Sequence, residues 1–196
     1  MVVDLEIVNL SKMSRSRTSF PHIHILIEYL NNNQFLMVHN LYTQWIKRSS
    51  RYQKPAQILC LASSLGHIDV LKWFFENRPN DFTPRVMDMA ASYNQMRALK
   101  WLHTHHNYGC TNVAAERASE FGYVSVLEFL FKFKYSEPRS SLIDIAATSG
   151  QLETIKFLHE SRVACSNKAI DNAASENHTE VVEYLLKSVK AGYTPQ

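Results

Sequence analysis

The sequence has few of the residues that form tight turns or covalent cross-links. Its 196 residues include only five glycines and six prolines, whereas an all-β chain needs such residues at many turns. The three cysteines, Cys60, Cys110 and Cys165, form an odd and sparse set, which indicates reduced thiols rather than a disulfide framework. These scarcities argue against an all-β fold and against a disulfide-stapled one.

Long apolar runs and a strong net charge are also missing. No stretch of the sequence approaches the roughly 18 consecutive apolar residues of a membrane span. The apolar N-terminal stretch contains the acidic residues Asp4 and Glu6, which a secretory signal peptide would not have. We therefore expect no membrane partner and a cytoplasmic or nuclear location. A secreted protein whose signal peptide had been removed would look the same. The net charge of +3 is too small to predict nucleic-acid binding.

One phrase of about a dozen residues occurs five times, and internal repeats of this kind decide the fold. The copies lie at 62–73, 90–101, 118–129, 146–157 and 173–184. Their starts at 62, 90, 118, 146 and 173 give spacings of 28, 28, 28 and 27 residues. This regularity predicts a chain of stacked, self-similar units.

The glycines fall at two positions of the repeat. Gly and Asn tolerate the left-handed backbone conformation that ends a helix. The first position holds Gly66, Asn94, Gly122, Gly150 and Asn177, and the second holds Gly109 and Gly192. Each unit is therefore predicted to be a helix, a left-handed stop, a second helix and a second stop.

The segments between these stops have helical signatures. Thr83-Pro84 is typical of an N-cap followed by proline in the first turn, and Thr111 and Ser166 are equivalent caps. The first helix of each unit carries paired small residues that let neighbouring helices approach closely. The second helix carries an apolar stripe, as at Val70, Leu71 and Phe74.

The repeat resembles the ankyrin repeat, with its A-A-x-x-G-H-x-x-V-V-K-x-L phrase, most closely at 62–74 and 172–185. Ankyrin units usually have about 33 residues, and the residues missing here are those of the β-hairpin finger. Short units of this kind are similar to the divergent ankyrin repeats of protists and large DNA viruses. The resemblance implies an all-α, ankyrin-type helical repeat solenoid with short or absent β-hairpin fingers. Its five units within 55–196 are 55–82, 83–110, 111–138, 139–165 and 166–192.

The chain before the repeats has two interpretations. Residues 1–19, with the run Ser14-Arg15-Ser16-Arg17, are predicted to be a flexible arm. Residues 20–54 are predicted to be helical and to form a cap, since His39 and Trp45 stand 28 residues before His67 and Trp73. Alternatively, Phe20-Pro21 and Trp45 resemble an F-box, which implies a substrate adaptor that binds ubiquitin-ligase components. The cap is the simpler interpretation, and we favour it.

The other end also has two interpretations. Thr194-Pro195 falls in register with Thr83-Pro84, so either the array of repeats is longer or the last helix pair is a cap. A cap needs a polar outer side, and Glu180, Glu183 and Lys187 supply polar residues there. We favour the cap.

Two columns of chemically similar residues run through the units, and both are expected to be structural. Aromatic residues on the second helices are interpreted as inter-repeat core rather than a stacking platform for bases; they are Trp73, Trp101, Phe129, Phe157 and Tyr184. Acidic residues on the first helices are interpreted as hydrogen-bonding between repeats rather than binding a basic partner; they are Asp88, Glu116, Asp144 and Asp171.

No motif predicts a metal site, a cofactor or catalysis. His103 and Cys110 recur in the repeat pattern as His159 and Cys165, so with His105 and His106 they are not expected to form a zinc site. The sequence contains no Gly-rich phosphate loop, no G-x-S-x-G and no H-E-x-x-H. We therefore expect no metal, no cofactor and no enzymatic activity.

The resemblance implies a partner-binding surface along the concave face, at the two variable positions after the paired small residues. We predict partner-binding residues at Ser64, Leu65, Ser92, Tyr93, Glu120 and Phe121, with Thr148, Ser149, Ser175 and Glu176 as further members of the two columns. Large apolar side chains on adjacent helices, about 10 Å apart, indicate a protein partner. They could equally shield the helices where the finger is missing. The predicted function is a monomeric, non-catalytic protein-interaction scaffold, with the F-box-like adaptor as the alternative.

Overall fold

A computed structural model describes residues 55–105 and 109–190, which belong to one compact unit, Lys54–Gln196. Several sequence-based expectations lie outside these residues. They are the arm at 1–19, the cap or F-box-like segment at 20–54, His106, Gly192 and Thr194-Pro195.

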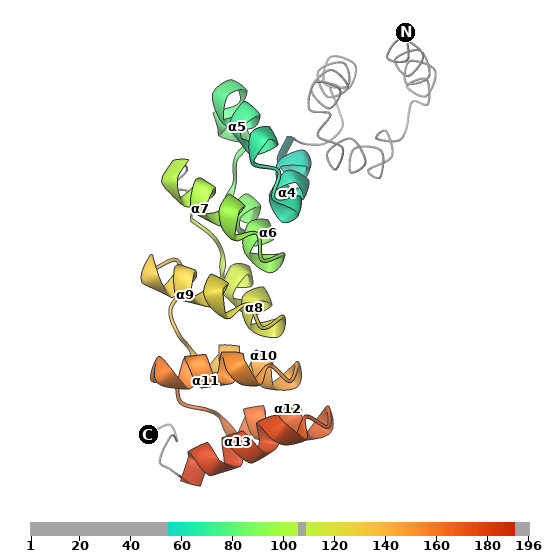
Figure 1. The fold of residues 1–196 in the computed structure, drawn as a ribbon, viewed down its shortest axis with the longest axis vertical. Helices are drawn as coiled ribbons and strands as arrows, with labels where there is room; N and C mark the ends of the chain where they lie inside the picture. The colour runs from blue at the N-terminus through green and yellow to red at the C-terminus, as the bar shows by residue number, and fades with distance from the viewer. Residues whose placement is uncertain (1–54, 106–108, 191–196) are drawn as a thin grey trace, which may run out of the picture. The chain divides into compact units, whose positions relative to one another are not determined.

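The described part of the chain is built from ten α-helices and one short 3₁₀ helix, and it contains no strand (Figure 1). This confirms the all-α repeat fold and the absence of hairpin fingers from the described loops. None of the described helices is long and apolar enough to cross a membrane. The elements in chain order are α4 (Pro55–Leu65), α5 (Ile68–Asn77), η1 (Pro79–Asp81), α6 (Pro84–Ser92), α7 (Met96–His105), α8 (Asn112–Glu120), α9 (Val124–Lys132), α10 (Ser140–Thr148), α11 (Leu152–Glu160), α12 (Asn167–Ser175) and α13 (Thr179–Lys190).

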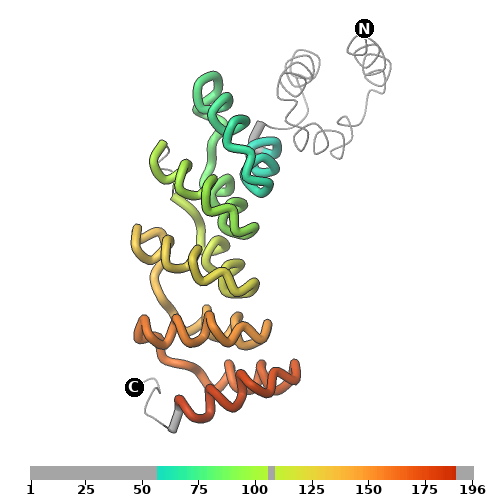
Figure 2. The backbone as a smooth tube through the Cα atoms, in the orientation of Figure 1, coloured from blue at the N-terminus to red at the C-terminus, as the bar shows by residue number. Residues whose placement is uncertain are grey.

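The helices form two layers, and the backbone tube shows the helix pairs stacked one after another along the array (Figure 2). The first helices of the units, α4, α6, α8, α10 and α12, pack against one another in sequence, and each also packs against the second helix of its own unit. Alanine makes this close packing possible: Ala62, Ala90, Ala118, Ala146 and Ala173 are all fully buried. The second helices touch their neighbours at fewer residues. The surface formed by the first helices and the residues that end them, among them Leu65, Tyr93 and Phe121, is called the first-helix face below.

The left-handed stops are confirmed. Backbone φ is +73° at Gly66, +75° at Gly122 and +70° at Gly150, and it is +54° at Asn94 and +61° at Asn177. The next residue in each unit donates its N–H to the carbonyl of the alanine that begins the phrase, as His67 does to Ala62 at 2.9 Å. This is the hydrogen bond that closes a helix end with a left-handed residue. The stop therefore fixes the angle between the two helices of each unit.

Replacing Gly122 with alanine is expected to lower the free energy of unfolding by about 1–2 kcal/mol, because an L-residue is strained at this φ. The added Cβ would also collide with the side-chain oxygen of Gln151 in the next unit. Asn94→Gly is the matched control, because it places glycine at the same repeat position, and we expect a change within about 0.5 kcal/mol. Urea denaturation measures both. Equal stability of Gly122→Ala and the parent protein would show that the stop does not constrain the fold.

The N-caps differ from one unit to the next. The Thr111 hydroxyl accepts a hydrogen bond from the Val113 N–H and the Ser166 hydroxyl accepts one from the Ala169 N–H, which confirms both caps. The prediction for Thr83 is half right. Pro84 occupies the first turn, but the Thr83 side chain makes no capping hydrogen bond. The fourth unit has Arg139 at this position, and the next subsection shows how its guanidinium is used.

Candidate functional site

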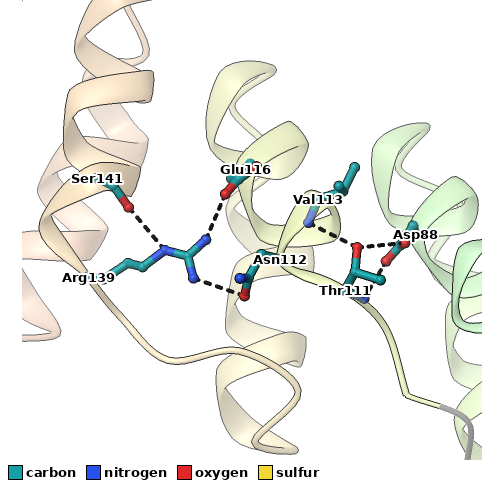
Figure 3. A network of polar contacts seen from close by, with 7 residues as sticks. All are labelled: Asp88, Thr111, Asn112, Val113, Glu116, Arg139 and Ser141. Atoms are coloured by element: carbon teal, nitrogen blue, oxygen red, sulfur yellow. Dashed lines mark hydrogen bonds and ion pairs between the residues drawn. The ribbon is translucent and has the colours of Figure 1, made fainter.

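Three of the four carboxylates of the acidic column, those of Asp88, Glu116 and Asp144, reach the start of the following unit, as Figure 3 shows for Asp88 and Glu116. Asp88 on α6 accepts hydrogen bonds from the Thr111 backbone N–H at 2.7 Å and from the Thr111 hydroxyl at 2.8 Å. Asp144 on α10 accepts one from the Ser166 hydroxyl at 2.5 Å. Thr111 and Ser166 are themselves N-caps, so the carboxylate orients the residue that starts the next first helix.

The junction between the third and fourth units uses a guanidinium instead of a hydroxyl (Figure 3). Arg139 donates to Glu116 at 2.9 Å, to the side-chain oxygen of Asn112 at 2.9 Å and to the Ser141 hydroxyl at 3.0 Å. All three guanidinium nitrogens are therefore engaged, two of them with α8 and one with α10. The structural interpretation of the acidic column is confirmed at these three junctions.

Asp88 is the most buried member of the column, at 5% exposed. Its burial raises the pKa of the carboxyl group, although the two hydrogen bonds from Thr111 and the nearby Arg85 act in the opposite direction. The desolvation of the ionised carboxylate thus outweighs its partners. This carboxylate therefore serves to pack one unit on the next.

The aromatic column forms a ladder of ring contacts between units, so the structural interpretation holds, although only one of its members is buried. Four of the five members, from Trp101 onward, each meet a ring on the preceding second helix. The centroid distances are 5.9 Å for Phe75–Trp101, 5.5 Å for His103–Phe129, 5.9 Å for Phe131–Phe157 and 5.5 Å for His159–Tyr184. Phe129 is buried, whereas the other four column members are half-buried. The residues of the second helices that are completely buried include the aliphatic residues Leu71, Leu99, Leu127 and Ile155.

The histidine and cysteine side chains are used in packing. His103 Nδ1 lies 2.7 Å from the Tyr135 hydroxyl, and His159 Nδ1 lies 3.2 Å from the Tyr184 hydroxyl. Burial lowers the pKa of His159. Burial also raises the pKa of the Cys110 thiol to about 12, which disfavours the reactive thiolate. Within 55–105 and 109–190, no group of three or more His, Cys, Asp or Glu residues is placed to hold a metal ion.

Two of the predicted partner-binding residues are prominent on the surface. Tyr93 is 57% exposed and Phe121 is 48% exposed. They occupy the same repeat position, directly after α6 and α8, where each ends its helix as a C-cap. The Phe121 ring also stacks on Tyr123, with centroids 5.9 Å apart. Both are therefore held on fixed helix ends of adjacent units.

The other four predicted residues are less accessible. Leu65, Ser92 and Glu120 are half-buried, and Glu120 forms a 2.7 Å ion pair with Arg117. Ser64 departs from the expectation. It is only 6% exposed, and its hydroxyl donates to the Leu61 carbonyl at 2.8 Å. The reason is local, since a short hydroxyl inside a helix satisfies itself by bonding to a carbonyl of the preceding turn.

An open groove of about 410 Å³ lies between α8 and α10, beside the predicted residues. The sequence interpretation missed it. Val113, 46% exposed, and Ile145 supply its apolar lining. Its polar lining comes from Glu116, Arg117, Glu120, Thr148 and Ser149. Helical spacing could have indicated it, because Val113, Arg117 and Glu120 are related by i, i+4 and i+7 and share one face of α8.

Comparisons with known proteins agree with this architecture. Residues 143–186 match the family described as "Ankyrin repeats (many copies)". The chain is also similar to an ankyrin repeat protein of Acanthamoeba polyphaga mimivirus, with 23% identity over 124 residues. That alignment covers 60% of this chain and 20% of the viral protein. The chain thus spans about a fifth of the length of the relative it matches, and that relative comes from a large DNA virus.

Proposed function

Because the helix pairs of this chain are divergent ankyrin repeats, we propose that it is a non-catalytic scaffold that binds a partner protein along the first-helix face. Ankyrin repeats indicate protein partners and a role in protein–protein interaction. The contact surface that we propose is centred on Tyr93 and Phe121, with Leu65, Ser92 and Glu120 around them. Ser64 is left out because it is buried.

The observation that supports this surface best is the exposure of two aromatic side chains at one repeat position. A soluble protein seldom leaves neighbouring large apolar side chains open to water unless a partner covers them. Residues that merely shielded the helices would lie flat and be mostly buried, whereas Tyr93 and Phe121 are 57% and 48% exposed. Tyrosine is also among the residue types that contribute most to binding energy at interfaces.

The groove between α8 and α10 suggests how a partner is held beside the aromatic pair. Val113 and Ile145 offer apolar contact inside it. The Arg117–Glu120 ion pair and the Glu116–Arg139 ion pair supply charges of both signs that are already matched within the protein. The groove therefore favours an apolar side chain from the partner, with hydrogen bonds at its polar rim.

Alanine substitution at Tyr93 or Phe121 is expected to weaken partner binding by at least about tenfold, equivalent to about 1.4 kcal/mol. The free energy of unfolding should stay within about 1 kcal/mol of the parent protein, since both side chains are largely exposed. The partner is first recovered by affinity purification from the native source, and binding of purified components is then measured by calorimetry.

Phe133→Ala is the matched control for this experiment. Phe133 is also an exposed aromatic residue, at 38%, but it follows the second helix α9. Its replacement should leave partner binding unchanged. Unaltered binding by both Tyr93→Ala and Phe121→Ala would overturn the proposed surface. A loss of stability above about 2 kcal/mol would instead identify them as core residues.

The F-box-like adaptor is the alternative, and it rests on the Phe20-Pro21 and Trp45 pattern, outside the described residues. A shortened chain that begins at Arg51 separates the two functions. Under the adaptor hypothesis it stays folded, keeps its partner and no longer recovers ubiquitin-ligase components from a lysate. Under the scaffold hypothesis with a capping segment, the full-length chain recovers no ligase components and the shortened chain is less stable.

A further inference from the structure

Two of the second helices are followed by a basic residue in the left-handed backbone conformation. Backbone φ is +56° at Lys134, just after α9, and +61° at Arg162, just after α11. The two residues are 28 positions apart and occupy the same repeat position. Tyr135 and Val163, the residues that follow them, donate their N–H groups back to carbonyls of α9 and α11 at 2.9 and 3.0 Å. Lys134 and Arg162 are therefore the left-handed stops of these two second helices.

Folding alone does not explain a basic residue at these stops. Lysine and arginine are strained at positive φ, whereas every stop of the first helices from Gly66 to Asn177 is a glycine or an asparagine. The negative pole of a helix end attracts cations, but α9 already ends in Lys132, and α6, α10 and α12 have no basic residue in their last turns. A strained residue that the helix does not need points to a role in function.

Both side chains are exposed, and neither forms an ion pair or a hydrogen bond within the described part of the chain. The equivalent residue of the first unit, Arg78, differs in both respects: its φ is −148°, and its guanidinium pairs with Asp81 at 2.6 Å. Glu137 follows Lys134 at the same separation as Asp81 follows Arg78, but these two form no ion pair. Lys134 and Arg162 thus present two positive charges that the described residues do not neutralise.

We propose that Lys134 and Arg162 form a second binding surface, which holds an acidic segment of a partner protein through one carboxylate at each cation. The helices that carry them, α9 and α11, pack against each other (Figure 1), which places the two stops about 10 Å apart. An extended chain advances about 3.3 Å per residue, so carboxylates three residues apart match this spacing. The surface shares no residue with the first-helix face, and the inference does not depend on that face or its partner.

The acidic residues beside the two cations favour a protein segment over a nucleic acid or an anionic membrane. Glu137 and Glu160 are both exposed and lie within three residues of Lys134 and Arg162 in the sequence. A uniformly charged array of phosphates needs a continuous basic stripe, which these glutamates interrupt. A protein segment can place single carboxylates opposite the two cations and neutral residues opposite the glutamates.

The probe is a synthetic peptide of four Glu-Gly-Ser repeats, and the same peptide with Gln in place of Glu is the uncharged control. Each is titrated into the full-length chain at low ionic strength, and amide chemical shifts are followed by NMR. We expect saturable shifts around Lys134 and Arg162 with the Glu peptide alone. The double variant Lys134→Gly/Arg162→Gly should bind it at least about tenfold more weakly. Arg97→Ala/Lys100→Ala, which removes as much charge from exposed positions of α7, should bind it as the parent does.

Urea denaturation of the same variants separates binding from a structural role. Glycine relieves the strain at positive φ, so the midpoint of Lys134→Gly/Arg162→Gly should equal or exceed that of the parent. A lower midpoint would overturn the proposal, because the two side chains would then support the fold. Absence of shifts in the parent, or an equal loss of binding in the α7 variant, would also overturn it. Tighter binding of a twelve-residue oligothymidylate or of anionic lipid vesicles at the same two residues would do so too, because the occupant would then carry phosphates.

Discussion

Replacing Leu127 with alanine should lower the free energy of unfolding by about 3 kcal/mol, the largest loss expected from a single substitution in this chain. Leu127 lies on α9 at the centre of the array and is completely buried. Its removal forfeits the burial of the side chain and leaves a cavity that the surrounding helices cannot fill. Urea denaturation followed by circular dichroism measures the loss.

Leu186→Ala is the control for this prediction. The same chemical change is made on another second helix, but Leu186 is 46% exposed, so we expect a loss of about 1 kcal/mol or less. Similar losses for the two variants would contradict the difference in burial between Leu127 and Leu186. The comparison thus tests whether α9 and α13 sit in different surroundings, as the described structure requires.

The helices and their left-handed stops could be predicted because every unit carries, at the same position, a residue type that such a stop needs. A left-handed stop needs Gly or Asn, and the five positions from Gly66 to Asn177 satisfy it with positive φ. The column of alanines predicted close helix contacts for the same reason, since no larger side chain fits there. Five imperfect copies reduce the ambiguity that one copy would leave.

Features that occur once could not be predicted in this way. Arg139 stands where the third and fifth units have the hydroxyl caps Thr111 and Ser166. Its contacts with Glu116, Asn112 and Ser141 are visible only in the structure. The groove between α8 and α10 depends on Val113 and Ile145, which occupy different columns of adjacent units. Both features arise from contacts between one unit and the next, so a pattern read within single units does not contain them.

Exposure was the hardest property to assign from the pattern. Ser64 and Ser92 occupy the same repeat position, yet Ser64 is buried and Ser92 is half-buried. The aromatic column was expected in the core, and four of its five members are half-buried. The helical periodicity and the residue type indicate on which side of a helix a residue lies. Its exposed fraction also depends on how closely the two neighbouring units approach each other.

Because the described units pack mainly against their neighbours, the stability of the array is expected to be a sum of intrinsic and junction terms. Two kinds of junction contact lie on opposite layers. The carboxylate-to-cap bonds join first helices, and the ring ladder joins second helices. Neighbouring units are thus joined in both helix layers, which restrains the rotation of one unit relative to the next. We expect this restraint to keep Tyr93 and Phe121 in a fixed position relative to each other.

Asp88→Ala should lower the free energy of unfolding by about 2 kcal/mol, the largest effect we expect from a polar residue. The change removes two hydrogen bonds and leaves the Thr111 backbone N–H, a donor at the start of α8, without its acceptor. The loss is limited because burial raises the pKa of Asp88, so removal of the charge also relieves a desolvation cost. Urea denaturation at neutral pH measures the difference.

Two further variants separate the hydrogen bonds of Asp88 from its charge. Asp88→Asn keeps an oxygen that accepts from the Thr111 N–H, and its amide donates to the Thr111 hydroxyl, so we expect a loss below about 1 kcal/mol. Asp171→Ala, at the equivalent but exposed position, should change stability by less than about 0.5 kcal/mol. If Asp88→Asn were as harmful as Asp88→Ala, the charge itself would hold the junction. Carboxylates would then be required in this column for electrostatic reasons and not as acceptors for the N-cap of the next unit.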